Sequence, residues 1–113
     1  YDRYQIPLFV VEIGLGQVYE LGPDGKVHDD YRIDYIRRHV QALKEAVKDG
    51  VDVMGYTYWG PFDIVSAGTG EMKKRYGFVY VDRDNEGKGT LERSKKDSFE
   101  WYKKLLASNG EEL

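Results

Sequence analysis

A single carboxylate stands at the end of the first apolar run of the chain. Pro7-Leu8-Phe9-Val10-Val11-Glu12 has the length of a strand, and Gly14 and Gly16 follow at once. A strand buried on both faces of a parallel sheet has such a continuous apolar run, and parallel α/β folds carry catalytic groups at the carboxyl ends of their strands. Glu12 is therefore a candidate catalytic residue. The alternative is a surface glutamate that closes a strand, because charges at strand ends are common.

Trp59 ends a second segment of strand type. The residues from Val51 to Trp59 are rich in β-branched and aromatic side chains. A carboxylate beside an aromatic plane suits a sugar, because the acid attacks or stabilises the anomeric carbon while the apolar face of the sugar stacks on the indole. Glu12 and Trp59 together predict a glycoside site. The alternative is that Trp59 is an ordinary core residue.

Ser66, Lys74 and Tyr76 lie in the long polar segment that follows Gly60-Pro61. Two hydroxyl groups that donate hydrogen bonds, together with an ammonium charge, can hold the oxygens of a phosphate. These side chains therefore predict an anion site. The alternative is that Lys73-Lys74-Arg75 is a solvated run of charge.

The elements that must position these groups follow from the apolar pattern. Between the two strand segments, apolar residues recur at spacings of three and four: Ile33, Ile36, Val40, Leu43 and Val47. This stripe predicts a helix over about 31–49, with Asp29 or Asp30 as its cap and Gly50 at its end. A strand, a helix and a strand of these lengths form a right-handed crossover with parallel strands, so both candidate residues are expected on the same rim.

The remainder of the chain predicts a hairpin and a second helix. Tyr76–Asp82 has the composition of a strand, and after a turn its partner is expected around Thr90-Leu91-Glu92. The last helix is expected to begin at Ser94, because Asp97 three positions later nearly matches a capping box. Asn109-Gly110 is expected to end it.

Length and composition limit the classes of protein. A chain of 113 residues is one domain, and it is shorter than the roughly 200 residues of a closed eight-stranded α/β barrel. Its 17 basic and 20 acidic residues are in mixed order along the chain, so no nucleic-acid partner is expected. The absence of cysteine excludes disulfides and fits a reducing, cytoplasmic compartment. His28 and His39 are too far apart to predict a metal site, and no apolar stretch has the length of a membrane span.

The motifs together resemble glycoside hydrolase family 1. Val11-Glu12-Ile13-Gly14-Leu15-Gly16 is similar to the nucleophile motif of that family, usually written with Glu-Asn-Gly. Asp49–Tyr56 resembles the last barrel strand of the family, and Trp59–Asp63 resembles its tryptophan-bearing loop. Ser66-Ala67 with Lys74–Phe78 is similar to the 6-phosphate pocket of the 6-phospho-β-glucosidase branch, and Ser98–Lys103 is similar to the closing helix of that branch. The resemblance covers nearly the whole chain, and several motifs in the right order make it specific.

The resemblance implies both a fold and a set of roles. Residues 1–113 would be a single partial TIM-barrel domain, the C-terminal βαβα portion (last two units) of a (β/α)8 barrel with a small β-hairpin inserted before the last helix. Glu12 would be the catalytic nucleophile of a retaining mechanism, and Trp59 would line the glycone site. The phosphate of the sugar would be held by Ser66, Lys74 and Tyr76. The small Ala67 would favour substrates of the gluco configuration. No cofactor and no metal are implied.

Two departures from the family pattern bear on activity. Ile13 stands where the family has Asn, so an apolar side chain replaces a polar one beside the nucleophile. The family's first six strands and its Asn-Glu acid/base motif have no counterpart in this chain. A retaining glycosidase needs a second carboxyl group about 5–5.5 Å from the first. The isolated chain is therefore expected to be inactive.

Three hypotheses remain open from the sequence. The first is the C-terminal part of a 6-phospho-β-glucosidase, which hydrolyses β-linked 6-phospho-glucosides. The second is a non-catalytic or engineered barrel module that self-assembles as a homo-oligomer or associates with the missing barrel segments. The third is a small-anion binding domain that uses only Ser66, Lys74 and Tyr76.

Overall fold

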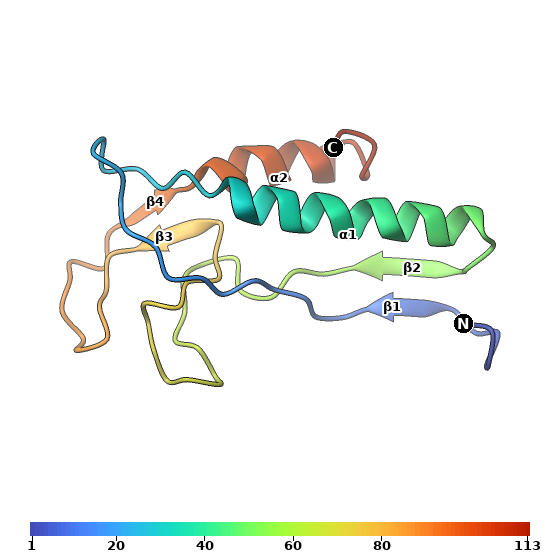
Figure 1. Ribbon diagram of the computed structural model, residues 1–113, viewed down its shortest axis with the longest axis horizontal. Coiled ribbons are helices and arrows are strands. Elements are labelled where there is room, and N and C mark those ends of the chain that lie inside the picture. The colour runs from blue at the N-terminus through green and yellow to red at the C-terminus, as the bar shows by residue number, and fades with distance from the viewer.

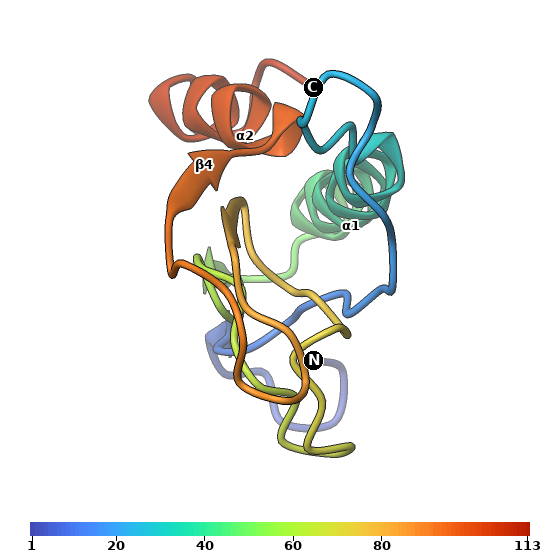
Figure 2. The same ribbon diagram turned by 90° about the vertical axis from the view of Figure 1, so that its left-hand side faces the viewer.

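The computed structural model describes all of residues 1–113, which form two helices and two small sheets (Figure 1). The elements in chain order are β1 (Leu8–Val10), α1 (Asp30–Lys48), β2 (Val53–Tyr56), β3 (Val79–Val81), β4 (Arg93–Lys95) and α2 (Asp97–Ala107). The two helices lie side by side, with the strands on one side of them (Figures 1 and 2).

The parallel strand–helix–strand unit predicted from the sequence is confirmed. β1 pairs with β2 in parallel, with Leu8 opposite Val53 and Val10 opposite Tyr56. Both strands point toward the end of the molecule that carries the long loops (Figure 1). The pairing continues past the strand ends, because the backbone N–H of Trp59 donates to the carbonyl of Ile13 at 2.6 Å. The segments that carry Glu12 and Trp59 therefore run together.

The expectation that the first strand is buried on both faces is wrong for this chain. Leu8 is 38% exposed and Phe9 is 49% exposed. β1 has a single neighbouring strand, and α1 covers only one face of the pair. The strands are also shorter than the apolar runs predicted, since β1 covers Leu8–Val10 and β2 covers Val53–Tyr56.

The core lies between the helices and the loops rather than within a sheet. Its buried centre consists of Ile36 from α1, Leu105 from α2 and Phe78, which precedes β3. The rings of Tyr58 and Tyr102 pack around Phe78, and Tyr102 stacks on it at 4.3 Å between ring centroids. The helix predicted over 31–49 is confirmed to within one residue, and its end at Gly50 has a φ of +91° that favours glycine.

The predicted hairpin is confirmed, but the start of the last helix is wrong. β3 pairs with β4 in antiparallel fashion, with Ser94 opposite Tyr80, so the partner strand is Arg93–Lys95 rather than Thr90–Glu92. Helix α2 begins at Asp97, and its first turn is held by a distant residue. The Asp29 carboxylate accepts hydrogen bonds from the backbone N–H and the hydroxyl of Ser98.

The same contact corrects the predicted cap of α1. Asp29 stands at the N-cap position of that helix, but its side chain makes no capping hydrogen bond there. Its carboxylate bonds to Ser98 and Arg32 instead. A residue predicted as a local helix signal therefore joins the starts of two helices that are far apart in the sequence.

The molecule is a flat, open slab. Its principal extents are 49 × 28 × 17 Å and its radius of gyration is 16.1 Å, whereas a closed domain of about 100 residues has a radius near 13 Å. Only 14 of the 113 residues are buried. Neither helix has the length and apolar character needed to cross a bilayer.

Candidate active site

Glu12 and Trp59 lie on the rim formed by the loops that leave β1 and β2. Glu12 is exposed and follows the end of β1 by two residues. Trp59 is 42% exposed, so it is not a core residue of this chain. Backbone hydrogen bonds from Thr57 to Val10 (2.9 Å) and from Trp59 to Ile13 (2.6 Å) enclose Glu12 between them. A carboxylate and an indole ring are thereby presented on adjacent loops.

The unusual Ile13 has an apolar environment. Its side chain lines a depression between β1 and α1, together with Val10, Ala42 and Leu43. The next residue, Gly14, lies under the indole, where a Cβ would come within 3.2 Å of Trp59 Cβ. The hydrophobic side chain beside Glu12 therefore faces other apolar side chains of β1 and α1.

Ser66, Lys74 and Tyr76 come together in the polar loop, residues 63–77. The Ser66 hydroxyl lies 3.2 Å from the Tyr76 hydroxyl, and Lys74 Nζ lies 5.7 Å from the centre of the Tyr76 ring. The hydrogen bond with Ser66 and the neighbouring Lys74 ammonium lower the pKa of the Tyr76 phenol below its ordinary value. A more acidic phenol is a better donor to an anion.

The interpretation of Lys73-Lys74-Arg75 as a solvated charge run is wrong for Arg75, which is buried. Lys73 forms a surface ion pair with Glu71 at 2.9 Å. Lys74 is half-buried, with its Nζ over the Tyr76 ring. The alternation of side chains along this segment places 74 and 76 on one side and 75 on the other.

A glycine brings the polar loop against the loop that carries Glu12. In this Glu12 loop, residues 11–17, a Cβ on Gly16 would lie 2.5 Å from Tyr76 Cζ and 2.9 Å from Lys74 Cε. Gln17 and Arg75 exchange two backbone hydrogen bonds of 3.0 Å each. The candidate carboxylate and the candidate anion site therefore belong to one continuous surface.

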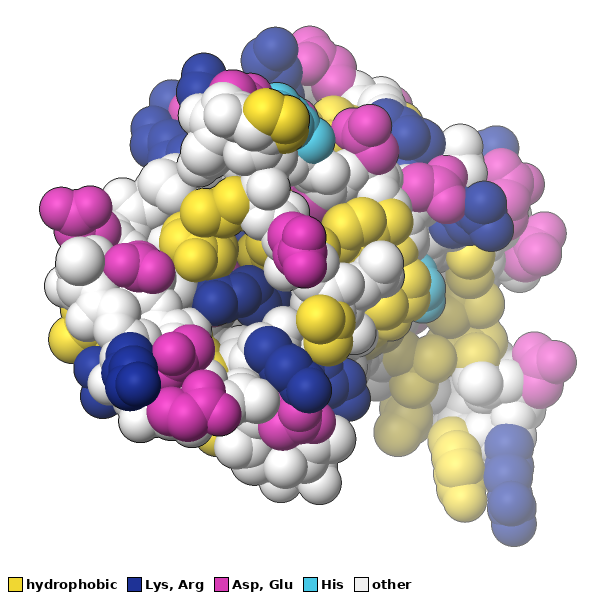
Figure 3. All heavy atoms as spheres, turned by 60° about the vertical axis from the view of Figure 1, so that its left-hand side comes forward, with side chains coloured by type: hydrophobic (Ala, Val, Ile, Leu, Met, Phe, Trp, Pro, Cys, Tyr) yellow, Lys and Arg dark blue, Asp and Glu magenta, His cyan; other side chains and the backbone are white.

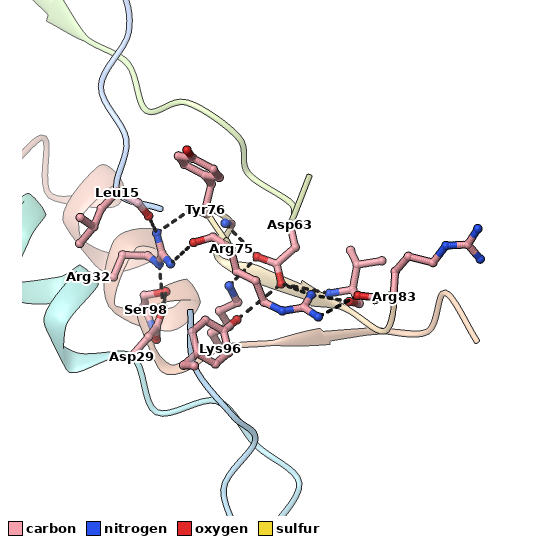
Figure 4. A network of polar contacts seen from close by, with 12 residues as sticks. Leu15, Asp29, Arg32, Asp63, Arg75, Tyr76, Arg83, Lys96 and Ser98 are labelled. Carbon is pink, nitrogen blue, oxygen red and sulfur yellow. Dashed lines mark hydrogen bonds and ion pairs between the residues drawn. The ribbon is translucent and has the colours of Figure 1, made fainter. Parts of the chain in front are cut away.

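Two buried ionic clusters lie beneath this surface (Figure 4). In the first, Arg32 Nε donates to Asp29 at 3.0 Å, and both side chains are fully buried. In the second, Asp63 accepts from Arg75 Nη1 at 3.1 Å and from Lys96 Nζ at 2.7 Å. Burial lowers the pKa of Lys96 to about 8, and the ion pair with Asp63 opposes that shift.

Charged side chains on the outer surface of the end that carries the long loops are mixed in sign. Figure 3 shows lysine, arginine, aspartate and glutamate side chains interspersed, with basic groups set into a hollow beside hydrophobic ones. This arrangement fits a local anion site better than a broad basic face for a polyanion.

Comparison with known proteins assigns the chain to a family. Residues 1–111 match the sequence profile of glycosyl hydrolase family 1. The chain belongs to glycosyl hydrolase family 1. It is 67% identical over its whole length to the aryl-phospho-beta-D-glucosidase BglA of Bacillus subtilis (strain 168) and 62% identical to the 6-phospho-beta-glucosidase AscB of Escherichia coli (strain K12). It spans 24% of the length of each of these relatives.

A solved family 1 structure has the same arrangement. The family 1 b-glucosidase from Thermotoga maritima superposes with a TM-score of 0.78 and 35% sequence identity, over 92% of this chain and 22% of the other. The chain is thus an α/β piece that matches about a fifth of a family 1 TIM-barrel enzyme.

The family motifs in the sequence pointed to residues on the rim and in the polar loop, of which Ser66 is buried, and they did not reveal the ion pairs beneath. Arg32 and Lys96 were not singled out, and Asp29 was predicted only as a possible helix cap, although all three side chains are buried. A signal for the pair of Asp29 and Arg32 was available, because an aspartate and an arginine three positions apart at a helix start can bond to each other. No local signal identifies Lys96, because its partner Asp63 is 33 positions away.

Proposed function

We propose that this chain is the C-terminal part, comprising the last two β/α units, of a retaining 6-phospho-β-glucosidase. The observation that carries the proposal is the close approach of Lys74 and Tyr76 to Gly16, in the same loop as Glu12, with the Ser66 hydroxyl beside that of Tyr76. An anion site beside a rim carboxylate is what a phosphorylated glycoside requires. The relatives named as phospho-β-glucosidases support the same substrate class.

In the proposed reaction, Glu12 is the nucleophile of a double displacement. Its carboxylate attacks the anomeric carbon, the glycosidic C–O bond breaks, and the leaving oxygen takes a proton from a second carboxylic acid. Water then attacks the covalent glycosyl-enzyme, gives its proton to that second carboxylate and releases Glu12. Trp59 stacks on the apolar face of the sugar. Lys74 balances the charge of the 6-phosphate, while Ser66 and Tyr76 donate hydrogen bonds to it.

The second carboxyl group must come from outside this chain. Glu45, Glu100 and Glu111 form ion pairs on or beside the helices, away from the rim. Glu71, in the polar loop, pairs with Lys73. Loss of general acid catalysis alone lowers a rate by about 10²–10⁴. The isolated chain should therefore show no appreciable turnover, whereas the complete enzyme should be active.

The complete enzyme provides the test of this function. We expect it to hydrolyse a chromogenic 6-phospho-β-glucoside with a much higher kcat/KM than the unphosphorylated glucoside. Glu12→Gln should abolish turnover of both, because the amide is a poor nucleophile. Labelling with a 2-deoxy-2-fluoro-6-phosphoglucoside, followed by peptide mass spectrometry, should find the sugar on Glu12. A label on another carboxylate, or equal rates for the two substrates, would contradict the proposal.

A further inference from the structure

The fully buried guanidinium of Arg32 bonds to both loops of the candidate site (Figure 4). Its Nη1 donates to the carbonyl of Leu15 at 2.7 Å and to the carbonyl of Tyr76 at 2.6 Å. Its Nη2 donates to the carbonyl of Arg75 at 3.1 Å. Leu15 belongs to the Glu12 loop, and the other two acceptors belong to the polar loop. One side chain on α1 therefore links these two loops, in addition to the backbone hydrogen bonds between Gln17 and Arg75.

The hydroxyl of Tyr58 completes this link. It accepts from Arg32 Nη1 at 2.6 Å and from the backbone N–H of Leu15 at 3.2 Å, and it donates to the carbonyl of Tyr76 at 3.2 Å. Its ring packs on Phe78, with 4.7 Å between the ring centroids. The hydroxyl is thus a polar connection between the two loops, and the ring contributes separately to the core.

Asp29 holds the guanidinium in the orientation that these bonds require. Its carboxylate is fully buried, lies 3.0 Å from Arg32 Nε and accepts two further bonds from Ser98. A buried arginine needs such a partner, because an unpaired charge in the interior is costly. The planar fork leaves both terminal nitrogens free to donate to the loops. A lysine ammonium at the same position could not reach all of these acceptors, since it has one nitrogen.

We propose that Arg32 is a positioning residue that sets the distance between the nucleophile and the phosphate site, with Tyr58 as its second support. The proposal rests on the function proposed above. The contacts lie close to the chemistry, because Leu15 is three residues from Glu12 and Tyr76 is itself a phosphate ligand. A sugar phosphate contacts both Glu12 and the phosphate site, so its binding is sensitive to the distance between them. An unphosphorylated sugar contacts only the Glu12 loop.

The test compares two substrates in the complete enzyme. For Arg32→Lys, the ratio of kcat/KM for the 6-phospho-β-glucoside to that for the unphosphorylated glucoside should fall by roughly 10- to 100-fold, the cost expected of a misplacement near 1 Å. The loss should appear mainly as a higher KM for the phosphorylated substrate. Tyr58→Phe keeps the ring and removes only the hydroxyl, so it should change the ratio in the same direction by a smaller factor.

Arg37→Lys is the matched control. Arg37 lies on the same helix, and its Nε donates to the Leu113 carbonyl at 2.6 Å, away from both loops. Its substitution should leave the ratio unchanged. If Arg32→Lys fails to fold, Tyr58→Phe decides the question, because its ring still fills the core.

The outcomes separate the two proposals. A wild-type enzyme that prefers the phosphorylated substrate, together with a Tyr58→Phe ratio that equals the wild-type ratio, would overturn the positioning role alone. If Arg32→Lys and Tyr58→Phe each lowered kcat/KM for the two substrates by the same factor, the positioning role would also be overturned, since such a result would indicate a purely structural role. A wild-type enzyme without any preference would overturn the proposed function, and the positioning role with it.

Discussion

At the scale of single residues, Lys74 is the charge on which phosphate recognition should depend. Its ammonium lies 5.7 Å from the centre of the Tyr76 ring, and the hydroxyl of that ring is 3.2 Å from the Ser66 hydroxyl. Lys74→Ala in the complete enzyme should weaken transition-state binding of the 6-phospho-β-glucoside by about 1.5–3 kcal/mol, the range for a hydrogen bond to a charged group. The unphosphorylated glucoside should be nearly unaffected. Steady-state kinetics on both substrates measures the difference.

The neighbouring Lys73 provides the control for that prediction. It pairs with Glu71 on the surface. Lys73→Ala should therefore change the transition-state binding of either substrate by no more than the small contribution of an exposed ion pair. If Lys74→Ala affected both substrates to the same extent, a specific role in binding phosphate would be excluded.

Gly16 offers a second test at the same scale, because it permits the close approach of the two loops. A methyl group there would meet Tyr76 and Lys74 at distances below 3.0 Å. Both contacts are with side-chain atoms, which can move away, so Gly16→Ala should displace the proposed phosphate ligands and raise KM for the phosphorylated substrate. Gly68→Ala, in the same polar loop with nothing within 4 Å, is the matched control. Indistinguishable kinetics of the two variants would show that the approach at Gly16 has no role in binding.

At the scale of elements, Asp29 joins the starts of α1 and α2. Its buried carboxylate is the partner of Arg32 Nε and of two donors on Ser98. Asp29→Ala should destabilise the fold by about 3–5 kcal/mol, because it leaves a buried guanidinium without its charge partner. Asp30→Ala, at an exposed position in the first turn of α1, should cost far less. Urea unfolding of the complete enzyme compares them, and similar midpoints for both variants would refute the role.

His28 makes the contact between the loop before α1 and the start of α2 dependent on pH. Its ring nitrogens lie 2.8 Å from Asp24 and 2.7 Å from Asp97, and hydrogen bonds to these carboxylates raise the pKa of His28, with Asp97 contributing more. A raised native pKa means that folding favours the protonated ring. This stabilisation is fully present below the unfolded pKa of about 6.5, and it is lost as the pH rises through the native pKa.

His28→Gln should remove this part of the pH dependence. Thermal unfolding between about pH 5 and 9 should therefore show a larger decline in Tm for the wild type than for the variant above the unfolded pKa of histidine. His39→Gln is the control, since His39 contacts the Tyr35 carbonyl rather than a carboxylate. Parallel curves for wild type and His28→Gln would contradict the prediction.

At the scale of the whole molecule, the chain exposes surface that a closed barrel would cover. The two-stranded parallel sheet has unpaired backbone groups on both edges. Large apolar side chains of the sheet and its flanks are exposed, among them Leu8, Phe9, Val11 and Met54. The isolated chain should therefore self-associate as a homo-oligomer, associate with the missing barrel segments, or aggregate.

Light scattering of the purified chain at increasing concentration tests this prediction. The apparent mass should rise with concentration, and addition of the remaining barrel segments should lower it by forming a defined complex. A monodisperse monomer that unfolds cooperatively would contradict the prediction, since it would mean that the open sheet is stable in water.

The sequence alone determined the local elements and the candidate residues of the two loops. The spacing of Ile36 and Val40 predicted α1 to within one residue, and the crossover rule predicted that Glu12 and Trp59 share a rim. These inferences succeed because helix periodicity and chain connectivity depend on residues that are near in sequence. The motif order identified the family for the same reason, since each motif is a short continuous segment.

Only the tertiary structure decided how the buried charges pair. Asp29 was predicted, with Asp30 as the alternative, to cap its own helix, yet its carboxylate bonds to Ser98, 69 positions away. Ser94, predicted to start α2, pairs with Tyr80 in the hairpin instead, and α2 begins at Asp97. Arg32 contacts carbonyls in both site loops, and backbone carbonyls carry no signature in the sequence. A charge removed from water must find a partner wherever the fold provides one, and spacing along the chain does not specify that partner.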